Sequence, residues 1–115
     1  IRAITEAGVV ASIGHTRANY YTTMAAVERG ARFATHLWNA MSGFTARTPG
    51  AVGTLLADDR VTLGVIADGR HLHPVTEKLT IELAGADALH ERVCQALLGN
   101  AERGLPELVG AHRRG

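Results

Sequence analysis

Apolar residues gather in three short runs along the chain, and polar residues follow each run. The runs cover residues 9–13, 31–36 and 61–67. The first is apolar except for the small Ser12, which is typical of a strand covered on both faces in a parallel sheet. Stretches long enough for a helix separate the runs. This alternation predicts the β-α-β order of an α/β protein with about three parallel strands and intervening helices.

Helix signals surround these runs. Residues 1–7 have the pattern of the last turns of a helix, closed by Gly8. Thr16 is expected to cap a helix over residues 17–29 that ends at Gly30. The residues expected on the apolar side of that helix are Ala18, Tyr21, Ala25 and Val27.

Residues 37–54 break this regularity with small, polar, Pro and Gly residues, and an irregular segment after a strand is often functional. A short helix is expected over residues 50–57. A further helix is expected to begin at His73-Pro74 and to run to about residue 84. Residues 87–98 have a weaker helical pattern, and no strand is expected after them.

Size and charge narrow the classes of protein. The chain has 115 residues, 46% of them hydrophobic, which suits one small domain or part of a larger one. A net charge of +1 indicates neither nucleic acid nor a membrane surface as a partner. No apolar stretch is long enough to span a bilayer. The single cysteine, Cys94, agrees with a reducing, cytoplasmic location and is expected on a helix face. The first residues lack the features of a signal peptide and look like a helix already begun, so we expect a fragment.

Side chains with metal-binding chemistry follow each predicted strand. His15 ends the first run, His36 ends the second, and Asp68 and His71 follow the third. Parallel strands bring such residues to one sheet edge, where ligands gather. Two neutral imidazoles there can share one divalent metal ion. Taken singly, each histidine is more typical of a hydrogen-bonded structural residue, and Asp68 of a turn cap.

Three residues of the irregular segment have competing interpretations. Arg47 is either a solvated loop charge or a bidentate clamp for phosphate or carboxylate. The amide of Asn39 can bind hydroxyls and phosphate oxygens. Trp38 is expected in the core rather than stacked on a ligand. His90 and His112 are expected on the surface.

Four segments together resemble the N-acetylglucosamine-6-phosphate deacetylase family of the amidohydrolase superfamily. They are GHTRANY at 14–20, ATHLWNAM at 34–41, RTPGAVG at 47–53 and IADGRHLHP at 66–74. Their order and spacing match the family up to about residue 83. Other amidohydrolases share the metal-binding histidines without these surroundings.

The resemblance implies roles for individual residues. His15 and His36 look like the two histidine ligands of a catalytic divalent metal ion, zinc or iron. Asn39 and Ala40 look like a substrate-contacting pair, and Arg47 looks like the residue that holds the sugar 6-phosphate. The residues that look like the segment closing around the substrate are Asp68, Gly69, Arg70 and His71. The family also implies a homodimer, with some contacts made across it.

The resemblance further implies a (β/α)₈ TIM-type barrel, of which residues 1–85 would supply about strands five to seven. The acidic metal ligand would come from a segment before residue 1. The family's general acid/base is an Asp in a Thr-Asp-Ala stretch, which this sequence lacks, and Asp87 is no credible substitute. Residues 86–115 do not follow the family and are expected to form a divergent helical or disordered tail.

The expected reaction of the intact enzyme is therefore metal-dependent hydrolysis of the N-acetyl group of N-acetylglucosamine 6-phosphate, and we expect this chain alone to be inactive. Two alternatives stay open. One is a non-catalytic fragment that binds phosphosugar, and the other is a different amidohydrolase, dihydroorotase-like or adenine deaminase-like. Arg47 and the HLWNAM segment argue against the second alternative.

Overall fold

The computed structural model describes residues 1–85, in which three strands and four helices alternate. The elements are α1 (Arg2–Glu6), β1 (Ala11–Ile13), α2 (Tyr20–Glu28), β2 (Ala31–Ala34), α3 (Gly50–Leu56), β3 (Thr62–Leu63) and α4 (Pro74–Ala84). The predictions for the tail, Cys94, His90, His112 and Asp87 fall outside the described residues. No helix within residues 1–85 is long and apolar enough to cross a lipid bilayer.

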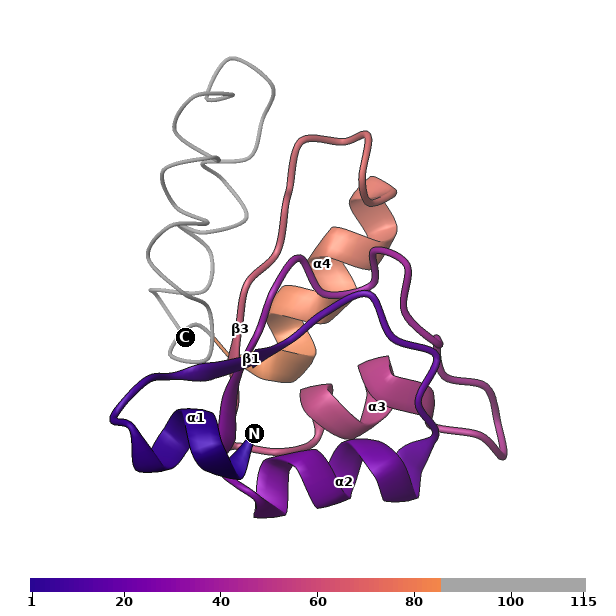
Figure 1. The fold of residues 1–115 in the computed structure, drawn as a ribbon. Coiled ribbons are helices and arrows are strands. Elements are labelled where there is room, and N and C mark those ends of the chain that lie inside the picture. The colour runs from indigo at the N-terminus through magenta and orange to yellow at the C-terminus, as the bar shows by residue number, and fades with distance from the viewer. Residues whose placement is uncertain (86–115) are drawn as a thin grey trace.

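The strands form one parallel sheet in the order β1-β2-β3. Helices α2, α3 and α4 pack in sequence order, with α3 touching both of the others, and α2 also contacts β2. Figure 1 shows α2 and α3 side by side and the long loops leaving the sheet at the opposite end from α2. The expected α/β fold with three parallel strands and intervening helices is confirmed.

The core lies between the sheet and these helices. Its members share near-complete burial, and they come from β2, β3, α2, α3 and the segments next to β2 and β3: Val27, Ala34, Leu37, Val52, Leu55, Val61, Leu63, Val65, Ala67 and Leu72. Burial of this apolar surface is the main force that holds the strands against the helices.

The strands are shorter than the apolar runs predict. Residues 9–13 were expected to be covered on both faces, yet Val9 and Val10 are 58% and 68% exposed. The reason is that pairing with β2 begins only at Ala11 and that β1 is an edge of the described sheet. Beyond β3, Val65 and Ala67 stay buried without ladder pairing, so burial continues where the strand has ended.

The start of α2 also differs from the prediction. Asn19 is the N-cap, and its side-chain oxygen accepts a hydrogen bond from the backbone N–H of Thr22. Thr16 instead accepts from the backbone N–H of Ala18 and closes a local turn, so the helix begins three residues later than expected. Tyr21, expected on the apolar side, is exposed, whereas Thr23 and Val27 are buried.

The other helix predictions are confirmed within a residue or two. Helix α3 lies inside the expected 50–57, and α4 begins at Pro74 with His73 as its N-cap. The Nδ1 atom of His73 accepts from the backbone N–H of Val75. Proline at the first helical position costs no hydrogen bond there, which is why the His-Pro pair marks the start reliably.

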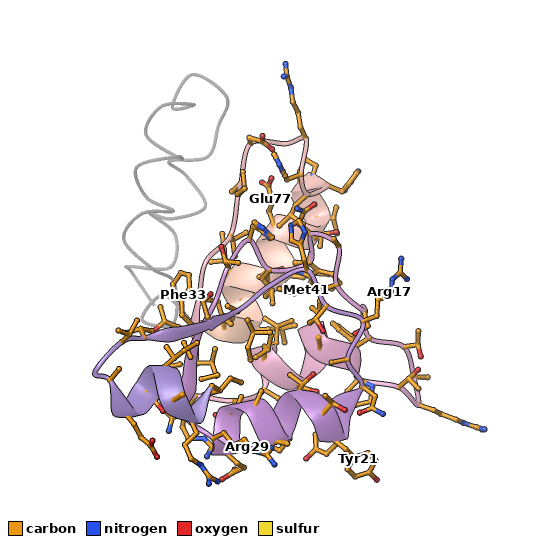
Figure 2. The ribbon with its side chains drawn as sticks, in the orientation of Figure 1. Arg17, Tyr21, Arg29, Phe33, Met41 and Glu77 are labelled. Carbon is orange, nitrogen blue, oxygen red and sulfur yellow. The ribbon has the colours of Figure 1, made fainter. Side chains whose placement is uncertain are left out.

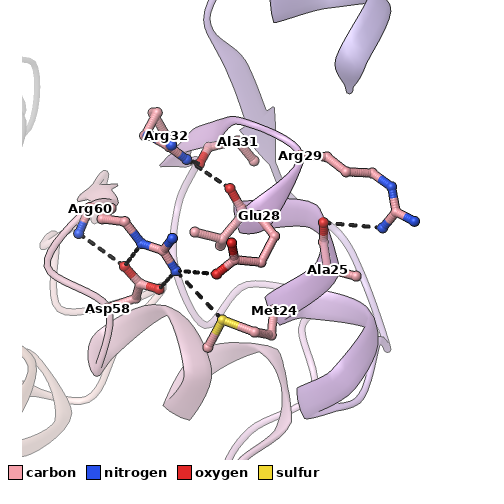
Figure 3. A network of polar contacts seen from close by, with 9 residues as sticks. Met24, Ala25, Glu28, Arg29, Ala31, Arg32, Asp58 and Arg60 are labelled. Carbon is pink, nitrogen blue, oxygen red and sulfur yellow. Dashed lines mark hydrogen bonds and ion pairs between the residues drawn. The ribbon is translucent and has the colours of Figure 1, made fainter.

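An ion-pair cluster joins α2 to the loop before β3, at the amino-terminal end of the sheet (Figure 3). The guanidinium of Arg60 binds both carboxylate oxygens of Asp58, at 2.9 and 2.7 Å, and reaches Glu28 at 2.9 Å. The hydrogen bond from Arg60 holds the pKa of the Asp58 carboxyl below its usual value, and Asp58 in turn raises the pKa of Arg60. The cluster therefore fixes the turn that leads into β3.

Candidate metal and substrate site

The two histidines predicted to share a metal ion lie side by side where β1 and β2 end. Their ring centroids are 4.6 Å apart, with the planes inclined by 52°. Imidazole nitrogens bind zinc at about 2.0–2.1 Å, so two rings sharing one tetrahedral ion have centres about 5 Å apart. The pair therefore has a separation that suits joint coordination of one cation.

The local backbone explains why these rings meet. The parallel pairing continues past the strands, because the N–H of Thr35 donates to the carbonyl of Ile13 at 2.9 Å. A Cβ atom at Gly14 would overlap the Cγ2 atom of Thr35 and lie 3.9 Å from Cε1 of His36. Glycine at this position thus allows the two strand ends to approach closely.

One nitrogen of the pair has unused bonding capacity. The Nδ1 atom of His36 is buried and has no hydrogen-bond partner among the described residues. A buried polar atom without a partner is costly, and binding of a metal ion would satisfy it. Neutral imidazole is a good ligand for divalent transition metals, so these residues fit such an ion.

Asn39 joins this pair. Its side-chain nitrogen lies 3.4 Å from Nε2 of His15, at the long limit for a hydrogen bond. Ala40, the next residue, has a left-handed backbone with φ 51°. His15 and His36 also have left-handed backbones, with φ 45° and 32°. The structure therefore brings together His15, His36 and Asn39, and Ala40 is the next residue in the chain.

Ser42 connects the two loops that carry the histidines, and the sequence motifs did not single it out. Its hydroxyl donates to the carbonyl of Ala18 at 2.7 Å and accepts from the N–H of Ala51 at 2.9 Å. Its own N–H donates to the carbonyl of Thr16. One small residue thus ties the loop after β1 to the loop after β2 and to the start of α3.

The segment after β3 forms a separate, tightly bonded turn. One oxygen of Asp68 accepts from the backbone N–H groups of His71 and Arg70, both at 2.8 Å. Its other oxygen lies 2.9 Å from Nδ1 of His71. These bonds, led by the backbone N–H of His71, hold the pKa of Asp68 well below its usual value. Asp68 therefore caps a turn, and any contact it makes with a ligand is additional to that role.

This turn is anchored to α4 by a buried carboxylate. The backbone N–H of Gly69 donates to Oε1 of Glu77 at 3.0 Å, and Glu77 is 1% exposed. Figure 2 shows the Glu77 side chain rising from α4 toward this loop. Nothing in the sequence pattern pointed to Glu77, because a glutamate on a helix is ordinarily solvated.

Two hollows are lined by other candidate site residues. His71 lines one of about 350 Å³ together with Trp38 and residues of α4. Arg47 lines another of about 480 Å³ with residues of α3, and Phe44 and Leu83 border both. Within residues 1–85 no hydrogen bond or ion pair joins Arg47 to the histidines, and no group of three His, Cys, Asp or Glu side chains could hold a metal ion. The structure thus gathers the histidine pair, and Arg47 and His71 line two different hollows.

Comparison with known proteins supports the resemblance that the motifs indicated. The chain is 43% identical over 89 residues to an N-acetylglucosamine-6-phosphate deacetylase of Bacillus subtilis (strain 168), across 77% of this chain and 22% of that protein. It is 37% identical over 89 residues to an N-acetylgalactosamine-6-phosphate deacetylase of Shewanella sp. (strain ANA-3), across 77% of this chain and 23% of that one. The chain thus spans less than a quarter of these relatives. No family model matches it.

Solved structures of deacetylases with the same name also resemble this chain. The N-acetyl-D-glucosamine-6-phosphate deacetylase of Mycobacterium smegmatis superposes with a TM-score of 0.74 at 41% identity, covering 76% of this chain and 23% of that one. A mutant of the same enzyme, which superposes equally well, is in complex with N-acetyl-D-glucosamine-6-phosphate. The similarity therefore extends to the fold of the described residues.

Proposed function

Because this chain is homologous to one segment of the N-acetylglucosamine-6-phosphate deacetylases, we propose that it carries part of the site for the same reaction. That reaction is metal-dependent hydrolysis of the N-acetyl group of N-acetylglucosamine 6-phosphate, which yields glucosamine 6-phosphate and acetate. The observation that carries the proposal is the pair of imidazoles 4.6 Å apart at the carboxyl ends of β1 and β2.

His15 and His36 would hold the divalent ion, and imidazole is a suitable ligand for both zinc and iron. When bound, such an ion supplies Lewis-acid chemistry, polarising the amide carbonyl and making water more acidic. The buried, unpartnered Nδ1 of His36 supports this role. Within residues 1–85 no third acidic or histidine ligand stands beside the pair, so we expect metal binding weaker than by a complete set of ligands.

The remaining site residues would bind and orient the substrate. Asn39 stands beside His15, where its amide can hold a polar group of the sugar close to the metal. Arg47 would take the 6-phosphate through a bidentate contact. The turn of Asp68, Gly69, Arg70 and His71 would close over the sugar, with His71 as the side-chain contact. Positioning of this kind can supply a large part of a rate enhancement.

A general acid/base is still needed to take a proton from water and deliver one to the departing amine. Its loss alone lowers a rate by about 10²–10⁴-fold. No residue within 1–85 is proposed for this role, so we expect little acetate release from the 115-residue chain. In keeping with the family resemblance, the three strands would be neighbours in a (β/α)₈ barrel of a cytoplasmic homodimer.

Metal uptake by the chain itself tests the proposal. Purified chain dialysed against zinc should retain about one ion, measured by elemental analysis, and His15→Ala and His36→Ala should each abolish retention. His73→Asn is the matched control, since it removes an exposed histidine while keeping an N-cap. Equal zinc retention by both alanine variants and the wild type would exclude the pair as ligands.

Binding of the phosphosugar tests the proposed substrate and the proposed role of Arg47. N-acetylglucosamine 6-phosphate should bind the zinc-loaded chain, and Arg47→Ala should weaken binding by roughly 10–100-fold, since charge-assisted hydrogen bonds contribute about 1.5–3 kcal/mol. Arg17→Ala, which removes another exposed arginine, is the control. Binding that survives chelation of the metal would favour a non-catalytic phosphosugar-binding role.

A second substrate has a specific observation in its favour. The Shewanella relative is named for N-acetylgalactosamine 6-phosphate, the epimer at carbon 4. Titrating both sugars into the zinc-loaded chain separates the two, because only the group that meets the 4-hydroxyl distinguishes them. Tighter binding of the galactosamine sugar would assign this chain to that specificity.

A further inference from the structure

We propose that Thr80, on helix α4, is a positioning residue for the candidate site. Its hydroxyl accepts a hydrogen bond from the indole Nε1–H of Trp38 at 2.8 Å, across 42 residues of sequence. We infer that this bond fixes the loop that carries Asn39 and Ala40. The consequence for substrate binding rests on the proposed function, whereas the hydrogen bond itself does not.

The loop after β2 needs such a restraint because its backbone is strained. Four non-glycine residues within 1–85 have left-handed backbone, and His36, Trp38 and Ala40 are three of them. Trp38 has φ 82°, a conformation that bulky residues rarely adopt. Strain of this kind persists only where the surrounding structure over-determines it, and it concentrates at functional sites.

The Thr80 hydroxyl is arranged to act as an acceptor. Thr80 is fully buried, and its own proton is donated to the carbonyl of Thr76 at 2.6 Å. The hydroxyl oxygen can therefore still accept a hydrogen bond, and the indole N–H of Trp38 donates it. The Trp38 ring is also held against Phe44, with centroids 5.7 Å apart. The indole is thus fixed at its nitrogen and on its ring.

This bond links the two parts of the site. Trp38 lies between Leu37, whose N–H donates to the carbonyl of Gly64, and Asn39, whose amide stands beside His15. Trp38 and Thr80 also line the hollow that contains His71. Helix α4 therefore reaches the metal-side loop through Thr80 and the Asp68 turn through Glu77, and sets the distance between them.

A matched pair of threonines permits a sharp test. Thr54 on α3 is also buried, and its hydroxyl also donates to a carbonyl four residues back, at 2.6 Å, but it accepts no indole. Trp38 is the only tryptophan, so its indole N–H gives a single assignable NMR resonance in the whole chain. The variants are Thr80→Val, Thr80→Ser and the control Thr54→Val.

In Thr80→Val the indole proton should exchange with solvent about tenfold faster, the side-chain amide resonance of Asn39 should shift, and the zinc-loaded chain should bind N-acetylglucosamine 6-phosphate about 2–10-fold more weakly. Thr80→Ser keeps the hydroxyl, so its indole exchange rate, Asn39 resonance and phosphosugar affinity should stay close to those of the wild type. Thr54→Val should also leave these three quantities unchanged. Trp38→Phe, which keeps the ring and removes the donor, should move the Asn39 resonance in the same way and covers the case in which Thr80→Val fails to fold.

An Asn39 resonance that responds equally to Thr80→Val and Thr54→Val overturns the proposal. If the wild-type chain takes up no metal and binds no phosphosugar, the proposed function fails. The indole and Asn39 resonances then still decide whether Thr80 positions the loop.

Discussion

Hydrogen bonds in the folded chain favour the ionised form of the Asp68 carboxyl and so lower its pKa. Three N–H groups, the first being the backbone N–H of His71, converge on its carboxylate and lower its pKa. A lowered pKa in the folded state means that the carboxylate stabilises the fold above the unfolded value, about 3.9, and that this stabilisation is lost as the pH falls below it.

The residue-scale prediction is that the turn at residues 68–71 loosens only in acid. In an NMR titration the Asp68 carboxyl should titrate well below pH 4, and the N–H resonances of Arg70 and His71 should shift together with it. Asp68→Asn should remove this acid-dependent shift. An Asp68 that titrates at the ordinary value would show that the turn is not formed in solution.

Sequence reasoning succeeds for residues whose placement follows from topology. His15 and His36 could be predicted to lie at one edge because parallel strands must end there. The Trp38–Thr80 and Gly69–Glu77 bonds could not, because the first joins residues 42 positions apart and the second depends on a buried glutamate. Thr16 and Asn19 both suit an N-cap, and only the local turn at Thr16 decides between them.

At the scale of elements, α3 depends on a glycine at its first turn. Gly50 has φ +61°, and a Cβ atom there would lie 2.6 Å from the carbonyl oxygen of Ser42 and overlap that of Gly43. Backbone atoms cannot move aside as a flexible side chain can. The Pro49-Gly50 pair therefore allows α3 to begin directly against the loop that contains Ser42.

Gly50→Ala is accordingly expected to destabilise the chain by roughly 2–5 kcal/mol, the sum of left-handed strain and steric overlap. Gly8→Ala is the matched control, because Gly8 also has positive φ, +76°, but nothing lies within 4 Å of its Cβ position. Gly8→Ala should lower the free energy of unfolding by only about 1–2 kcal/mol. Urea denaturation followed by Trp38 fluorescence measures both, and equal losses would contradict the close contact at Gly50.

For the molecule as a whole, the described sheet has two open edges, at β1 and β3. Next to β1, Val9 and Val10 are exposed, and several large apolar side chains are exposed elsewhere: Tyr21, Phe44, Val75, Leu79 and Leu83. Unpaired edges next to apolar residues favour association with other chains. The order of elements could be predicted from the sequence, whereas these exposed residues could not, because apolar runs were taken to be covered.

We expect the chain to self-associate with rising concentration through the β1 edge. Val10→Lys should lower the association constant measured by sedimentation velocity, since a lysine on an edge opposes strand pairing. Val75→Lys on α4, also at an exposed valine, should have a smaller effect. A larger effect of Val75→Lys would place the contact on α4 instead.

The ion pairs of Arg60 and the candidate metal ligands lie at opposite ends of the strands. Arg60, Asp58 and Glu28 tie the turn before β3 to the end of α2, whereas the histidines follow the opposite ends of the strands. Substitutions at these three positions are therefore expected to change the stability of the fold while leaving the geometry of the candidate site unchanged. Conversely, substitutions in the loops around Asn39 are expected to leave the Arg60 cluster intact, because it lies at the other end of the strands.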